Sequence, residues 1–190
     1  MEPVNSSSAS DALALIRDEL AGLVARIDAD ELQRLALLVE DARRVHLHGA
    51  GRSGIALRMT AMRLMHLGLD AHVVGEATAP AIEAGDVLLV ASGSGTTGGI
   101  VRAAETARSV GAAVAVLTTA PDSPLAALAD AVVTVPAAAK LDRSGTSSAQ
   151  YAGSLFEQLV VLLGDALFHT LWQRSGSTAD ELWPRHANLE

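Results

Sequence analysis

The chain has 190 residues, of which 49% are hydrophobic and 3% aromatic, and its net charge at pH 7 is −8. This length fits one compact domain, and the apolar fraction is too high for a disordered chain. The acidic balance disfavours a nucleic-acid-binding surface, which needs a basic face. The sequence has no cysteine, which excludes disulfides, thiolate metal sites and cysteine nucleophiles and agrees with a cytoplasmic location.

The N-terminal part predicts a flexible start followed by helices. Residues 1–10 are small and polar, and they lack the basic and apolar regions of a signal peptide. Apolar residues recur at helical spacing across residues 11–43, and this pattern predicts a lead-in of two amphipathic helices. Asp28 and Asp30 lie between them, where carboxylates favour the N-terminus of the second helix.

From residue 44 to 136, short runs rich in β-branched residues alternate with helical stretches. Near-continuous apolar strands that alternate with helices predict a parallel sheet covered on both faces, and therefore an α/β fold. The expected strands are residues 45–48, 71–75, 87–92, 114–118 and 132–135, and the expected helices between them lie near residues 53–68, 96–111 and 124–129.

The C-terminal part, residues 151–190, predicts one long helix and a polar tail. The helix covers about residues 154–173 and follows a polar stretch over residues 140–150. Because Glu157 and other polar residues interrupt its apolar pattern, we expect it to be too polar and too short to cross a membrane. No internal repeat is present, so we expect a single domain over residues 1–190.

Two of the expected strands run into glycine-rich loops that each begin a helix. In an open parallel sheet, ligands bind beyond the carboxyl ends of the strands. Glycine lets the backbone approach a ligand, and helix N-termini present free N–H groups to anions. Because the chain has a single lysine, Lys140, a phosphate would be held mainly by neutral donors and arginine. The candidate phosphate-binding residues are Gly51, Arg52 and Ser53 in the first loop and Ser92, Ser94 and Thr97 in the second.

Each loop also has a simpler interpretation. Serine and threonine at these positions are ordinary N-caps of helices that follow tight turns. The first loop, residues 49–54, fits the dinucleotide-binding pattern G-x-G-x-x-G, and Glu76 closes the next strand where a ribose-binding acid would lie. A dinucleotide, however, does not require the second, hydroxyl-rich loop, so a phosphate site is favoured.

Together the two loops resemble the SIS (sugar isomerase) domain. Further stretches resemble the 6-phospho-3-hexuloisomerase family, and the resemblance covers nearly the whole chain; they are residues 61–68, 73–76, 80–86 and 185–190. The resemblance implies a flavodoxin-like three-layer fold with a five-stranded parallel sheet, and a homo-oligomer such as a tetramer. It also implies interconversion of D-arabino-3-hexulose 6-phosphate and D-fructose 6-phosphate in the ribulose monophosphate pathway of formaldehyde assimilation. The plain loop 137–140 and the serine-rich segment 144–150 depart from what the family leads us to expect.

The implied reaction moves a carbonyl between neighbouring carbons through an enediol, which requires a general base and needs no cofactor. Glu157 matches the position of the presumed base in the family. His186 in the tail is the candidate acid, acting in a neighbouring subunit. His66 is its competitor, but it lies roughly 20 Å along one helix from the first loop and could serve only another subunit's site. Alternatively, Ser154 and Glu157 form a capping box, in which the glutamate has no catalytic part.

Other assignments remain open at this stage. His46 and His48 share one face of the first strand, but no third ligand is evident, so a buried polar pair is favoured over a metal site. Two other functions compete with the implied isomerase: a SIS-type regulatory module that binds a phosphosugar without turnover, and an isomerase of another sugar phosphate. We predict no membrane or nucleic-acid partner.

Overall fold

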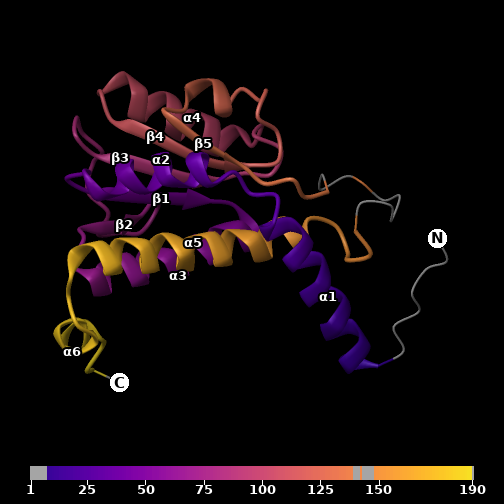
Figure 1. The fold of residues 1–190 in the computed structure, drawn as a ribbon. Helices are drawn as coiled ribbons and strands as arrows, with labels where there is room; N and C mark the ends of the chain where they lie inside the picture. Colours follow the sequence, from indigo (N-terminus) through magenta and orange to yellow (C-terminus); the bar gives the residue numbers. More distant parts are fainter. Residues whose placement is uncertain (1–7, 139–141, 143–147, 190) are drawn as a thin grey trace.

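The structure is a computed structural model that describes residues 8–138, 142 and 148–189. Its centre is a five-stranded parallel sheet between two layers of helices (Figure 1). The strand order β2-β1-β3-β4-β5 is the flavodoxin-like order, so the predicted α/β fold is confirmed. The strands are β1 (Val45–Gly49), β2 (Ala71–Val73), β3 (Val87–Ala91), β4 (Ala113–Thr118) and β5 (Ala131–Thr134).

The helices cover both faces of the sheet, as the apolar strands predict. One hydrophobic core lies between the sheet and α2, α3 and α5, and a second lies between the sheet and α4. Helix α5 lies alongside α3 on the outer side of the first core (Figure 1). The helices are α1 (Ala9–Val24), α2 (Ala29–Glu40), α3 (Gly51–Leu67), α4 (Gly98–Ser109), α5 (Ser154–Ser175) and α6 (Ala179–Leu182), with short 3-10 turns η1 (Ala126–Leu128) and η2 (Trp183–Arg185).

The predicted N-terminal helices are present. Helix α1 begins at Ala9, two residues earlier than expected, and the Ser8 hydroxyl caps it by accepting a hydrogen bond from the Asp11 N–H group. Residues 1–7 lie outside the described part. Asp28 caps α2 by accepting from two backbone N–H groups, as its position in the sequence predicts. Figure 1 shows α1 projecting away from the sheet and its covering helices.

Several element boundaries differ from the predictions; α3, for example, begins at Gly51, two residues earlier than expected. β2 ends at Val73 because the chain turns at Gly75, which has a φ of 94°. Helix α4 begins at Gly98, two residues later than expected, since residues 92–97 form a loop. The segment expected to be a short helix over residues 124–129 makes only the single turn η1.

Helix α5 is longer and more apolar than the prediction about membrane crossing assumed. It has 22 residues and a mean hydropathy of 1.3, so by length and composition alone it could span a bilayer. In the structure it is a core helix, and one side of it is buried against α3 and the first core. The prediction that it is too short and too polar was therefore wrong, and packing explains its apolar character.

Candidate active site

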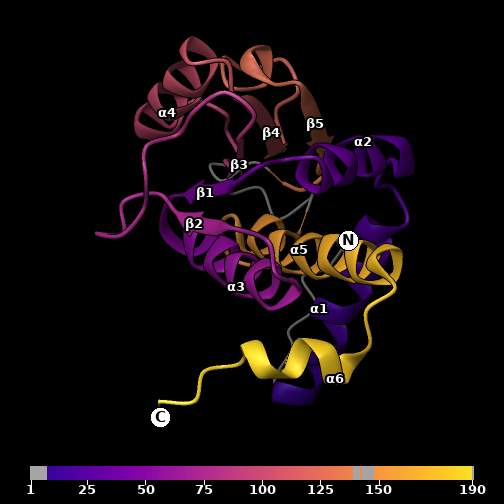
Figure 2. The ribbon, with the colours of Figure 1, turned by 90° about the vertical axis from the view of Figure 1, so that its left-hand side faces the viewer.

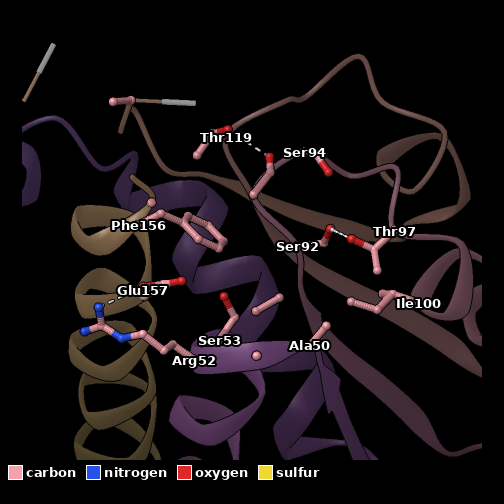
Figure 3. Close-up of a pocket in the computed structure, with 15 residues that line it drawn as sticks. Ala50, Arg52, Ser53, Ser92, Ser94, Thr97, Ile100, Thr119, Phe156 and Glu157 are labelled. Carbon is pink, nitrogen blue, oxygen red and sulfur yellow. Dashed lines mark hydrogen bonds and ion pairs between the residues drawn. The ribbon is translucent and has the colours of Figure 1, made fainter. Parts of the chain in front are cut away.

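A cleft of about 340 Å³ lies at the carboxyl ends of β1 and β3 (Figure 3). This volume is within the usual range for small-molecule sites, about 300–1,000 Å³. The cleft contains all six residues predicted to bind phosphate together with Glu157. Its lining residues are Ala50, Gly51, Arg52, Ser53, Ala91, Ser92, Gly93, Ser94, Thr97, Ile100, Thr119, Ala138, Gly153, Phe156 and Glu157.

The first loop is a tight turn that only glycine permits. A Cβ atom at Gly54 would collide with the carbonyl oxygen of Gly49, and both partners are backbone, so neither can move aside. Gly51 has a φ of 57°, in the left-handed region that other residues rarely adopt. The turn therefore brings the start of α3, including Arg52 and Ser53, directly against the end of β1.

The helices that start at this cleft differ from the others in how they are capped. The N-cap residues of α3, α4 and α5 are Ala50, Thr97 and Gly153, and none of them makes a side-chain capping hydrogen bond. By contrast, α1, α2 and α6 are each capped by a side chain. Since the first N–H groups of a helix lack partners within the helix, the uncapped helices can offer theirs to an anion in the cleft.

The second loop is fixed in place from β4. The carbonyl oxygen of Gly93 accepts hydrogen bonds from the Thr118 hydroxyl at 3.1 Å, the Thr119 hydroxyl at 2.8 Å and the Thr119 N–H group at 3.1 Å. Thr119 also lines the cleft, although we did not predict it. Its position directly after a buried strand, beside a second threonine, is a signal that could have revealed it.

The hydroxyls of the second loop are oriented by one another (Figure 3). The hydroxyl oxygens of Ser92 and Thr97 lie 3.3 Å apart. The Ser94 oxygen accepts from the N–H group of Thr96 at 3.3 Å and from its hydroxyl at 3.0 Å. Because Ser94 only accepts in these two bonds, its own proton can be donated to a ligand.

Glu157 faces the first loop across the cleft. Its carboxylate lies 3.2 Å from the Arg52 guanidinium, and its side chain is 19% exposed, whereas that of Arg52 is 61% exposed. Arg52 also donates to the Ser154 hydroxyl at 3.3 Å. The alternative capping box does not form, because the Ser154 hydroxyl donates to the Tyr151 carbonyl at 2.7 Å rather than capping α5. The Phe156 ring, which we did not predict, packs beside Gly93 on the same wall.

His186 does not lie in the cleft of its own chain. It follows α6, at the opposite end of α5 from Glu157 (Figures 1 and 2). Its ring stacks on that of His66 at a centroid distance of 4.0 Å, and Arg185 fixes the tail by donating to the His66 carbonyl at 3.2 Å. Burial lowers the pKa of His66, and the nearby His186 and Arg63 lower it further. The two candidate histidines thus lie together, far from the cleft.

The remaining polar candidates lie elsewhere. Glu76 forms an ion pair with Arg58 and does not line the cleft. His46 is buried, with its Nε2 atom 3.4 Å from the carboxylate of Asp86, which matches a buried polar residue better than a metal ligand. Among the described residues, no group of three or more His, Cys, Asp or Glu side chains could hold a metal ion. Lys140 and most of the serine-rich segment lie outside the described residues.

Comparisons with known proteins agree with this geometry. A family model described as the SIS domain matches residues 38–162. The chain is similar to a protein of Mycobacterium gastri named 3-hexulose-6-phosphate isomerase, with 57% identity over 94% of this chain and 89% of that protein. A Bacillus subtilis protein of the same name is 37% identical over 94% and 97% of the two chains. A Methanococcus jannaschii crystal structure from which that function was inferred has a TM-score of 0.81 at 25% identity and covers 95% of this chain and 99% of its own.

Proposed function

This chain belongs to the SIS-domain family, and we infer that it is a 3-hexulose-6-phosphate isomerase, which interconverts D-arabino-3-hexulose 6-phosphate and D-fructose 6-phosphate. One observation carries the proposal beyond the family. A single cleft holds neutral phosphate donors from two loops on one side and a carboxylate on the other. The reaction supplies a step of formaldehyde assimilation by the ribulose monophosphate pathway.

The phosphate group binds between the two loops. The starts of α3 and α4, which have no side-chain caps, border this space, and Ser53, Ser94 and Thr97 line it. Among the described residues that line the cleft, Arg52 is the one that carries a positive charge. Such a site binds a dianion through hydrogen bonds to charged oxygens, which are stronger than those between neutral groups.

Glu157 is the general base. It removes the proton from one carbon of the bound sugar and returns it to the neighbouring carbon, so the carbonyl moves between C3 and C2 through an enediol. Positioned proton transfer of this kind typically contributes about 10²- to 10⁴-fold to the rate. The position of Glu157 supports the role, because its carboxylate lines the cleft and lies 3.2 Å from the guanidinium of Arg52, one of the expected phosphate-binding residues.

His186 acts as an acid in the cleft of a second copy of the chain, where it opens the furanose ring of fructose 6-phosphate. Its distance from its own cleft supports this arrangement, and so does the surface of α3. Ile55, Met59 and Met62 lie along that helix with exposed fractions of 62%, 47% and 50%. Apolar side chains that line one helix in this way are characteristic of a face that a partner covers. We therefore propose a homo-oligomer, of which a tetramer is one form.

We also propose that residues 1–190 form a single SIS domain and that the enzyme works in the cytoplasm on a sugar-phosphate substrate. The absence of cysteine from the sequence and the packing of α5 into the core support that location.

The test is isomerisation in deuterated water. Purified protein is incubated with fructose 6-phosphate, without added metal or nucleotide, and followed by NMR. We expect the 3-ketose to form with deuterium on the reacting carbon, and Glu157→Gln to lose both turnover and exchange by at least about 100-fold. Saturable binding of fructose 6-phosphate without turnover or exchange would refute the isomerase and favour a phosphosugar-binding regulatory module.

A further inference from the structure

Helix α1 holds the segment that leads into the catalytic helix. The carboxylate of Glu19 accepts three hydrogen bonds from this segment: from the Ser148 hydroxyl at 2.9 Å, the Ala149 N–H group at 2.8 Å and the Gln150 side-chain amide at 2.9 Å. These residues are 129 to 131 positions away in the sequence. This half-buried carboxylate holds the segment firmly, because hydrogen bonds to a charged group are stronger than those between neutral groups.

The same network continues into α5. The side-chain carbonyl of Gln150 accepts from the Gln158 amide at 2.8 Å, and Gln158 is the neighbour of Glu157. Gly153, which lies between the anchored segment and Glu157, lines the cleft. A chain of contacts therefore runs from α1 through Gln150 to the first turns of the helix that carries the proposed base.

The N-terminal helices also hold the chain where it leaves the sheet. Arg26, just beyond α1, donates to the Pro136 carbonyl at 3.1 Å. Glu31 of α2 accepts from the Thr134 N–H group at 2.7 Å. Ala138, two residues after Pro136, lines the cleft. Both described ends of the connection between β5 and α5 are thus tied to the same pair of helices.

These contacts do little for the hydrophobic core. Helix α1 has one buried side chain, Leu23, and it projects away from the sheet (Figure 1). An apolar residue in place of Glu19 would cost no core packing, yet the chain places a carboxylate with three partners there. Burial alone would raise the pKa of Glu19, but the hydrogen bonds from residues 148–150 outweigh it and lower the pKa. The carboxylate is therefore ionised at neutral pH.

We propose that Glu19 is a positioning residue of the active site, which holds residues 148–150 so that Glu157 faces the substrate. The proposal rests on the isomerase function inferred above. Its physical basis is that a misplacement of about 1 Å in a catalytic group can reduce the rate about 100-fold.

The test compares Glu19→Gln with Asp18→Asn. Asp18 is the adjacent residue on α1, and within the described part of the chain its carboxylate pairs with the neighbouring Arg17. We expect Glu19→Gln to lower kcat for fructose 6-phosphate at least tenfold with KM changed less than threefold, whereas Asp18→Asn matches the parent. The thermal midpoints of the two variants should agree within a few degrees. In the double variant Glu19→Gln/Gln150→Glu, the carboxylate and amide exchange places, and kcat should recover at least threefold.

Amide hydrogen exchange of residues 148–158 provides a readout that does not depend on turnover. We expect faster exchange in Glu19→Gln than in Asp18→Asn, and slower exchange again in the double variant. The proposal is overturned if exchange is unchanged, if kcat stays at the parent value, if the double variant fails to recover, or if the loss follows a large fall in thermal midpoint. If the parent protein shows no turnover but amide hydrogen exchange responds as expected, the isomerase assignment is wrong. The contact between Glu19 and residues 148–150 is then structural only, and the positioning proposal also fails.

Discussion

The close packing of α3 and α5 leads to a prediction about Gly164→Ala. At the contact, Gly164 of α5 faces Thr60 of α3, a residue that is 2% exposed. A Cβ atom at Gly164 would overlap the Thr60 hydroxyl oxygen and lie 3.2 Å from its Cβ atom and 3.3 Å from its methyl carbon. The Thr60 hydroxyl is not free to move, since it donates to the Ala56 carbonyl one turn earlier in its own helix.

The expected magnitude follows from two opposing terms. Overpacking a filled interior costs about 1–3 kcal/mol. Replacing glycine by alanine within a helix stabilises it by about 0.8–1 kcal/mol. We therefore expect Gly164→Ala to lower the free energy of unfolding by up to about 2 kcal/mol. Gly22 of α1 is the matched control, because a Cβ atom there has no neighbour within 4 Å. Gly22→Ala should therefore show only the stabilisation that alanine gives a helix relative to glycine.

Urea denaturation followed by circular dichroism, at one fixed protein concentration, measures both variants. The double variant Thr60→Ala/Gly164→Ala removes the overlapping hydroxyl and methyl groups, so it should be more stable than the sum of the single changes by at least about 1 kcal/mol, a coupling typical of residues in contact. Equal gains for Gly164→Ala and Gly22→Ala, or strictly additive effects in the double variant, would refute the view that this glycine sets the distance between the two helices.

Three further predictions concern the site, the buried carboxylate and the tail. Ser94→Ala should raise KM for fructose 6-phosphate about 10- to 100-fold in steady-state assays, since a hydrogen bond to a charged group contributes about 1.5–3 kcal/mol. Burial alone would raise the pKa of Asp86, but hydrogen bonds from a backbone N–H group, a guanidinium and a histidine outweigh it and lower the pKa. Asp86→Ala should cost about 1–3 kcal/mol at pH 7, because it leaves the donors to this carboxylate without their acceptor. The difference, measured by urea denaturation, should shrink as the pH falls below about 4. Because the pKa of His66 is lowered in the folded state, protonation opposes its stacking on His186. Stability should thus be lost as the pH falls below about 6.5, and a step in Trp183 fluorescence that is absent in His66→Gln would report it.

The apolar pattern of the sequence was sufficient for the α/β class and for one side of the site, whereas the flavodoxin-like strand order was implied by the resemblance to the SIS domain. The period of the apolar residues separates strands from helices because it reflects local backbone geometry. The two glycine-rich loops could be placed together because the carboxyl ends of parallel strands share one edge of the sheet. Ser92, Ser94 and Ser53 were identified in this way, and all three line the cleft.

Only the tertiary structure decided the partners of Glu157, His186 and Glu19, because these contacts join residues that are far apart in the chain. Whether Glu157 caps its own helix or pairs with Arg52 depends on how α5 lies beside α3, which no local pattern determines. The position of His186 beside His66 depends on how the tail returns along α3. The partners of Glu19 lie about 130 residues away, so its local sequence shows only an acidic residue on an amphipathic helix. Local sequence encodes backbone conformation and which side chains are buried, whereas the partner of each polar side chain is settled only when the helices pack.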